Sequence, residues 1–158
     1  MQITPDPLTK PQTLALLASH TADLRRNNPS ARACYVLDTA RLQTDPAITV
    51  FSAWSDHQQA KELLGIAALK ELSPVAGEVK SMRTATSHQR KGVGRALLRF
   101  LVEEGRRRGY ECLYLETGTR REFAGARALY HGEGFEDCGA FGGYVDVDGE
   151  NCFMRLRL

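Results

Sequence analysis

Apolar and polar residues follow different spacings along the chain, and each spacing predicts a different element. The first residues, Met1–Thr4, favour a short strand that stops before Pro5. Residues 11–24 favour a helix, since Pro11 suits a first helical turn and leucines recur roughly on one face, at Leu14, Leu17 and Leu24. A second, short helix is expected within Ala31–Leu42.

Beyond residue 47 the pattern becomes that of strands. Ile48–Trp54 is rich in β-branched and aromatic residues, and Glu62–Leu72 is a second apolar run. The polar residues 55–61 between them predict a hairpin loop. Gly77–Thr84 alternates polar and apolar residues, which predicts a third strand.

Helical spacing returns after Gly92, and Gly109 is well placed to end this helix. The apolar stripe comprises Val93, Leu97, Leu98, Leu101 and Val102. A short strand is expected at Glu111–Thr117. Thr119 and Glu122 have the spacing of a capping box, which predicts a helix from there to about His131. Two strands, near Ala140–Val147 and Asn151–Leu158, complete the chain.

The order of these elements predicts the fold class. Several neighbouring strands have links of hairpin length, whereas others are separated by helices. This favours a mixed sheet with helices on its faces over a doubly wound parallel sheet. No internal repeat or linker divides the 158 residues, so we expect a single domain over residues 1–158.

Composition narrows the function. The 21 basic and 19 acidic residues give a net charge of +2, too balanced to favour a nucleic acid or a membrane surface. The basic run Arg106–Arg108 is also flanked by glutamates. No apolar run approaches the roughly 20 residues of a transmembrane helix, and no secretory signal is visible. The spacing of the cysteines predicts reduced thiols in a cytoplasmic protein and no metal site, at Cys34, Cys112, Cys138 and Cys152.

The run before the long helix predicts a site for phosphate. Gly92 and Gly94 lack Cβ atoms, so the backbone there can turn sharply and approach a ligand closely. The first turn of a helix offers unpaired N–H groups and a positive dipole end. Two familiar phosphate motifs are excluded, because Leu97 stands where a dinucleotide fingerprint needs glycine and no GKS or GKT follows.

A third pattern fits. Gln89-x-x-Gly92-x-Gly94 resembles the Q/R-x-x-G-x-G/A signature of the GNAT superfamily of acyl-CoA-dependent N-acyltransferases. The segment from Ala126 to Phe135 resembles the same family's A-x-x-L-Y-x-x-x-G-F segment. The resemblance implies a mixed, mostly antiparallel sheet of six to seven strands with helices on both faces. It also implies acetyl-CoA as co-substrate and transfer of its acetyl group to an amine.

The same resemblance assigns residues to the coenzyme. Backbone amides of the turn would bind its diphosphate, and the preceding strand would lie along its pantetheine arm. By position these residues are Met82, Arg83, Thr84, Gln89, Arg90, Lys91, Gly92, Val93, Gly94 and Arg95. One departure is Phe123, which stands where the family often has an asparagine that contacts the coenzyme.

Two residues are implied as catalytic. Glu78 occupies the place where several members of the family carry their general base, and an ordered water is the alternative. Strand alternation puts Glu78 on the same face as Lys80 and Met82, and Lys80 is available to pair with it. Tyr130 matches the family's tyrosine, whose phenol commonly protonates the departing sulfur.

The acceptor is expected to be a small-molecule primary amine, without nucleic-acid or membrane partners. A protein or peptide amine stays open as acceptor, as does a module that binds acyl-CoA without turnover. The oligomeric state is also open, with a homodimer among the alternatives. Residues available for the acceptor pocket are Arg25, Arg26, Tyr35, Trp54, Phe141 and Tyr144, with Trp54 expected in the core.

Overall fold

The computed structural model describes residues 1–27, 39–56, 61–147 and 149–158. Within them, seven strands form one sheet in the order β1-β2-β3-β4-β5-β7-β6. The strands are β1 (Gln2–Pro5), β2 (Ile48–Trp54), β3 (Leu63–Ser73), β4 (Ala76–Thr84), β5 (Cys112–Gly118), β6 (Glu136–Cys138) and β7 (Asn151–Arg157). The helices are α1 (Pro11–Asn27), α2 (Thr39–Thr44), α3 (Val93–Arg107) and α4 (Ala124–Gly132), with short 3-10 helices η1 (Thr86–His88) and η2 (Arg121–Phe123).

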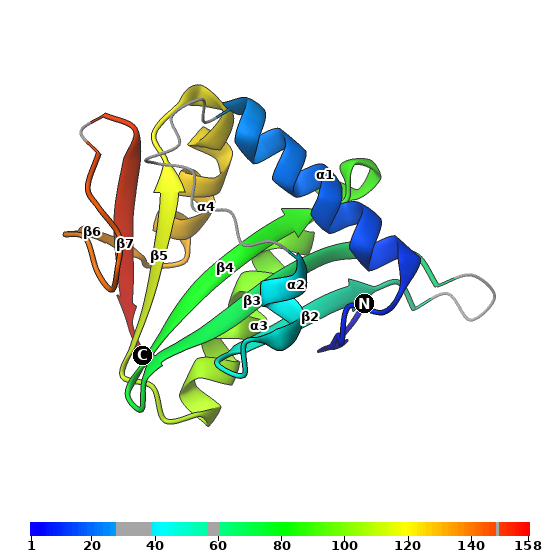
Figure 1. The fold of residues 1–158 in the computed structure, drawn as a ribbon, viewed down its shortest axis with the longest axis horizontal. Helices are drawn as coiled ribbons and strands as arrows, with labels where there is room; N and C mark the ends of the chain where they lie inside the picture. The colour runs from blue at the N-terminus through cyan, green and yellow to red at the C-terminus, as the bar shows by residue number, and fades with distance from the viewer. Residues whose placement is uncertain (28–38, 57–60, 148) are drawn as a thin grey trace.

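The sheet is mixed and mostly antiparallel, as expected. Each pair of neighbouring strands is antiparallel except β4 and β5, which are parallel. Strand alternation sends side chains to two cores, because Phe51 and Ala53 join one cluster while Ile48 and Val50 join the other. Helices α1 and α2 cover the second cluster on one face, and α3 lies behind the sheet on the other (Figure 1).

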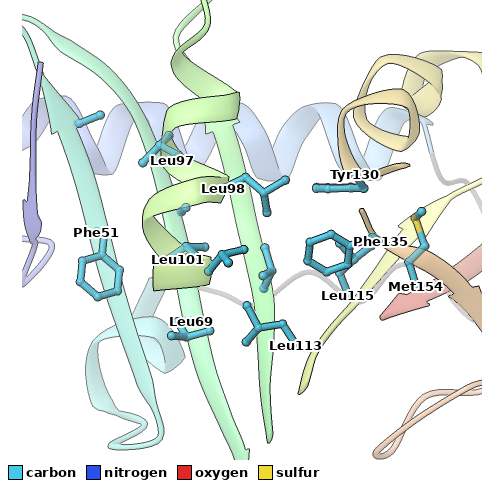
Figure 2. Packing of buried hydrophobic residues seen from close by; sticks show 14 of the residues in the cluster. Phe51, Leu69, Leu97, Leu98, Leu101, Leu113, Leu115, Tyr130, Phe135 and Met154 are labelled. Atoms are coloured by element: carbon cyan, nitrogen blue, oxygen red, sulfur yellow. The ribbon is translucent and has the colours of Figure 1, made fainter. Parts of the chain in front are cut away.

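Helix α3 follows the predicted stripe. Its five apolar stripe residues are buried in the larger cluster, which Figure 2 shows packed between the helix and the sheet. Burying each leucine of this kind contributes roughly 1.5–3 kcal/mol. The helix ends at Arg107, and Gly109 after it has a φ of 78°, which allows two closing bonds. The Gly109 amide donates to the Arg106 carbonyl and the Tyr110 amide donates to the Gly105 carbonyl, both at 3.0 Å.

Strands β4 and β5 pair over a short distance and then separate. Their register joins Ala76–Glu78 to Cys112–Tyr114, and the rest of the two described strands has no mutual pairing. Figure 1 shows the two strands starting side by side near the C-terminus and then diverging, with β5 running toward α4 and β4 toward α1. The separation opens the sheet in its middle and positions the site described below.

A β-bulge changes the direction of side chains in β4. Between the pairs Ala68–Lys80 and Ile66–Arg83, β3 advances two residues while β4 advances three, and Ser81 has a φ of 51°. The expected shared face of Glu78, Lys80 and Met82 is therefore wrong for Met82. Its side chain packs into the cluster beneath α3, whereas Lys80 stays beside Glu78.

The last part of the chain also departs from expectation. Residues 140–147 form no strand, and the short β6 at Glu136–Cys138 precedes them. A turn at Gly142, with φ of 55°, bends the segment. The buried side chain of Asn151 then accepts from the Val147 amide at 3.0 Å and donates to the Val145 carbonyl at 3.1 Å. These backbone groups thus obtain partners without a sheet, so β-propensity does not decide the outcome.

The predicted capping box does not form. Thr119 donates its hydroxyl to the Gly149 carbonyl at 2.6 Å, and α4 begins at Ala124 after the 3-10 turn η2. Of the helix expected within Ala31–Leu42, residues 31–38 lie outside the described residues, as do Cys34 and Tyr35, and α2 begins at Thr39. The cysteines that the structure describes, Cys112, Cys138 and Cys152, are free thiols.

The basic run at the end of α3 is paired with glutamates. Glu104 accepts hydrogen bonds from Arg107 and Arg108 at 2.7 Å each, and Arg106 pairs with Glu103. The Arg107 hydrogen bond is the main cause that lowers the pKa of Glu104 to about 2. No helix in the described ranges is both long and apolar enough to cross a membrane.

Candidate acetyl-transfer site

A small cavity of about 130 Å³ lies where β4 and β5 separate. Its wall combines side chains from both strands, from α1 and α4, and from the segment before β7. The lining residues are Leu17, His20, Thr21, Leu24, Glu78, Val79, Lys80, Ser81, Met82, Glu116, Thr117, Gly118, Phe123, Ala126, Tyr130 and Tyr144. The predicted catalytic pair, Glu78 and Tyr130, thus meets in one cavity.

The glycine-rich turn lies between η1 and α3. Arg90 and Gly92 both have positive φ, 59° and 83°, which gives the backbone the alternating curvature of an anion-binding nest. The bond from the Ala96 amide to the Gly92 carbonyl, at 3.0 Å, closes the first helical turn. The amides of Val93, Gly94 and Arg95 lie inside that turn, where a helix has no acceptors of its own.

The surroundings of this turn suit a diphosphate. Residues 89–92 are exposed, while Val93 is buried and anchors the turn to the core. A Cβ on Gly92 would meet nothing within 4 Å, so the space beside this residue is open. The turn and the start of α3 carry three exposed cationic residues, Arg90, Lys91 and Arg95, and Arg95 also pairs with Glu133 at 3.0 Å. Backbone N–H groups, a helix N-terminus and positive charge together favour an anion.

The coenzyme residues predicted on β4 point in two directions. Met82 lines the cavity from the α3 side, whereas Arg83 extends toward α1 and forms an ion pair with Asp23. Burial, and to a smaller extent the charge of Arg83, lowers the pKa of His20 to about 4, so this imidazole is neutral at pH 7. The Thr84 hydroxyl lies next to Gly94, 3.5 Å from where a Cβ would stand.

Tyr130 is buried at the edge of the main cluster. Figure 2 shows its ring beside Phe135, and their centroids are 6.0 Å apart. Its hydroxyl donates to the Met82 sulfur at 3.9 Å. Burial raises the pKa of Tyr130 to about 12, helped by the charge of Glu116. The phenol is therefore a neutral hydrogen-bond donor at physiological pH.

Glu78 is 2% exposed and, among the described residues, forms a polar cluster with Lys80 and Tyr144. The Lys80 ammonium donates to its Oε1 at 2.7 Å, as the sequence suggested. The Tyr144 hydroxyl donates to the same oxygen and accepts from Lys80. These contacts give the buried carboxylate the partners that it needs.

Glu116 is a cavity residue that sequence reasoning missed. It lies on β5, where the strand has separated from β4. Burial is the main cause that raises its pKa to about 7; the nearby Glu78 raises it further, and Lys80 and a hydrogen bond from Asn151 lower it. No motif marks this residue, because its neighbours come from distant parts of the chain. The alternation of Glu111–Thr117 places it in a strand and nothing more.

The other predicted pocket residues are dispersed. Tyr144 lines the cavity, and Phe141 stands behind it with ring centroids 5.0 Å apart. Trp54 is buried and donates to the Ser52 hydroxyl at 2.8 Å, so it belongs to the core as expected. Arg26 pairs with Asp23 at 2.9 Å, and Arg25 is exposed. Phe123 packs its ring against Gly118, in the cavity wall.

Comparison with known proteins agrees with this geometry. Residues 16–135 match the model of the acetyltransferase (GNAT) family. The chain belongs to this family. It is 40% identical to the uncharacterized N-acetyltransferase YsnE of Bacillus subtilis strain 168, over 100% of both chains. The expected family membership is therefore confirmed, and with it the expected fold class.

Two crystal structures extend the comparison of this GNAT chain. A candidate acyl-CoA N-acyltransferase from Klebsiella pneumoniae has 27% identity and a TM-score of 0.77, covering 99% of this chain and 97% of that one. A GNAT acetyltransferase from Elizabethkingia anophelis with acetyl-CoA bound shares the fold, at 18% identity and a TM-score of 0.68 over the same shares.

Proposed function

We propose that this chain is an acetyl-CoA-dependent N-acetyltransferase that transfers the acetyl group directly to a small primary amine. The observation that carries the proposal is the cavity between β4 and β5, lined by Tyr130, Glu78 and Glu116. An amide-rich turn that can bind an anion, together with a cavity that holds a proton donor and carboxylates, is what transfer from a thioester to an amine requires.

Acetyl-CoA, when bound, supplies an acetyl group activated as a thioester. The amides of residues 90–95 would hold its diphosphate, with Gln89 at the first position of the turn. The backbone of Met82–Thr84 would accompany the pantetheine arm, since β4 lacks pairing to β5 beyond Glu78. This support comes from backbone groups, so the outward direction of the Arg83 side chain does not oppose it.

Proton transfer is assigned to side chains of the cavity. A primary amine is mostly protonated near neutral pH, and a base must remove a proton before nitrogen can attack the acetyl carbon. As the carbon–sulfur bond breaks, the sulfur takes up a proton. Tyr130 is suited to donate it, because its phenol is neutral at this pH and lies beside Met82 on the proposed path of the arm.

Two carboxylates can act as the base. Glu78 is the residue predicted from the sequence, directly or through an ordered water, and its burial and position support that role. Glu116 is favoured by one further observation, the pKa of about 7, which is suited to exchanging protons at physiological pH. The replacements Glu78→Gln and Glu116→Gln separate the two. The base variant is expected to lose about 100-fold in kcat, and loss of Glu116 as base would remove the rise of activity through pH 7.

The acceptor is assigned from the size of the cavity and its cover. The cavity has a volume of about 130 Å³, and α1 and Tyr144 form part of its wall. A space of this size suits a small amine. A thiol-release assay with acetyl-CoA against amines, amino acids and peptides tests this assignment. Turnover with peptides alone would identify a protein acetyltransferase instead.

Tyr130→Phe tests the chemistry. The variant is expected to lower kcat about 10- to 100-fold and to keep coenzyme affinity within twofold, because the ring packing is preserved. Unchanged kcat would remove the assigned role of the phenol. Coenzyme binding by calorimetry without turnover of any amine would favour a non-catalytic acyl-CoA sensor.

A further inference from the structure

The segment between β6 and β7 contributes Tyr144 to the cavity wall. Its hydroxyl donates to Glu78 and accepts from Lys80, while Lys80 itself donates to Glu78 at 2.7 Å. The Lys80 nitrogen also lies 4.9 Å from the centroid of the Tyr144 ring. The side chains of Glu78 and Lys80 are 3% and 10% exposed, so the hydroxyl completes a cluster that is largely shielded from water.

The position of this hydroxyl is set by packing. The Tyr144 ring meets Phe141 edge-on at 5.0 Å, and Phe153 of β7 lies 5.9 Å away. The Tyr144 amide donates to the Phe141 carbonyl at 3.1 Å. Asn151 supports the next residues of the segment through the Val145 carbonyl. The segment thus delivers one hydroxyl to one place in the cavity.

We propose that Tyr144 is a positioning residue for the acceptor half of the cavity. Its hydroxyl holds the Glu78 carboxylate and the Lys80 ammonium as one unit, against which the acceptor amine docks. Buried ion pairs are favourable only when their geometry is fixed and their remaining hydrogen-bonding capacity is used. A carboxylate must also stand within about 2.6–3.2 Å of an amine to exchange a proton with it. The assignment rests on the proposed function.

The test is steady-state kinetics of Tyr144→Phe with acetyl-CoA and an amine that the wild-type enzyme acetylates. The change keeps the ring and removes the hydroxyl. We expect the KM of the amine to rise about tenfold, with the KM of acetyl-CoA within twofold. Tyr114→Phe is the matched control, because Tyr114 belongs to the same aromatic cluster, 5.0 Å from Phe141, and does not line the cavity. It should leave both KM values unchanged.

A double-mutant cycle identifies the partner. In the Glu78→Gln background, Tyr144→Phe should add less than twofold, because the carboxylate that it orients is already gone. An equal effect in both backgrounds, or wild-type amine kinetics in Tyr144→Phe, would overturn the proposal.

A spectroscopic readout separates this proposal from the proposed function. In protein labelled with ¹⁵N-lysine, the Lys80 ammonium should give a slowly exchanging signal, assigned by its loss in Lys80→Met. The signal should disappear in Tyr144→Phe and persist in Tyr114→Phe. Persistence in Tyr144→Phe contradicts the positioning role even if no amine is acetylated. Failure of the wild-type enzyme with every amine overturns the proposed function, whatever the lysine signal shows.

Discussion

The glycine-rich turn and the cavity between β4 and β5, the proposed coenzyme end and acceptor end of the site, are built in different ways. The turn at residues 89–95 is one contiguous run, and it offers backbone amides held by left-handed conformations at Arg90 and Gly92. The acceptor end gathers Glu78, Glu116 and Tyr144 from β4, β5 and the segment before β7. The turn holds strained backbone conformations, and the cavity holds charged groups that are removed from water. A local motif can build the first, whereas only the complete fold can build the second.

The largest effect that sharpens this contrast is expected at Gly92. In Gly92→Ala the new Cβ stands in open space and disfavours the left-handed backbone. We expect coenzyme affinity to fall about 100-fold, which corresponds to about 2.7 kcal/mol. Titration calorimetry with CoA measures it.

Gly109 provides the matched control at the other end of α3. It has a φ of 78°, and a Cβ there also meets nothing within 4 Å. Gly109→Ala and Gly92→Ala should therefore each lower the free energy of unfolding by about 1 kcal/mol, the usual penalty of a left-handed alanine. Gly109→Ala should leave CoA affinity unchanged. Equal loss of affinity in both variants would mean that stability, and not the turn, governs binding.

The next effect concerns charge at the acceptor end. The folded protein holds the pKa of Glu116 near 7, above the ordinary value of 4.5. The folded state therefore binds this proton more tightly than the unfolded state, and the associated stability is full below pH 4.5 and is lost as pH rises through 7. Glutamine does not titrate. Relative to the wild type, the free energy of unfolding of Glu116→Gln should thus rise by about 1–3 kcal/mol between pH 4.5 and pH 8, as an order of magnitude.

Urea denaturation at several pH values, without coenzyme, measures this difference. If the difference in free energy of unfolding between variant and wild type stays constant from pH 4.5 to pH 8, folding does not raise the pKa of Glu116. The predicted contrast between the two ends would then be lost. Gly92→Ala should show no such pH dependence, because it changes no titratable group.

The smallest effect is expected at Asn151. Its amide holds the Val145 carbonyl and the Val147 amide, and it also contacts Glu116. Asn151→Ala should reduce the free energy of unfolding by about 1 kcal/mol, since the exposed segment can bond to water in its place. Because this segment carries Tyr144, the KM of the amine should rise by a few-fold with that of acetyl-CoA unchanged. If Asn151→Ala is destabilised but keeps the wild-type KM for the amine, the segment does not affect binding of the amine.

The sequence was sufficient for features that depend on neighbouring residues. Helix α3 follows from a periodicity of 3.6, and its end follows from the glycine at position 109. The shared face of Glu78 and Lys80, which allows their pairing, follows from a periodicity of 2. The family resemblance rested on the same contiguous runs. Coenzyme contacts at residues 82–84 and 89–95 stay predictions, which Gly92→Ala addresses directly.

Features that depend on distant residues were missed. Glu116 has its unusual pKa because burial and Glu78 act on it together, and neither is visible in its own strand. The apolar residues near Tyr144 suggested a strand, but Gly142 and the Asn151 side chain satisfy that backbone in another way. The wrong face for Met82 has a single cause, the additional residue in β4 at Ser81.

The additional residue at Ser81 determines on which face of the sheet the following side chains of β4 lie. Removing Ser81 would carry Met82 and Thr84 through the sheet to the α1 side and bring Arg83 to the α3 side, with the composition otherwise unchanged. A guanidinium would then stand where a thioether now lies beside Tyr130. Loss of one codon in β4 would therefore exchange an apolar side chain for a charged one beside Tyr130 without any substitution.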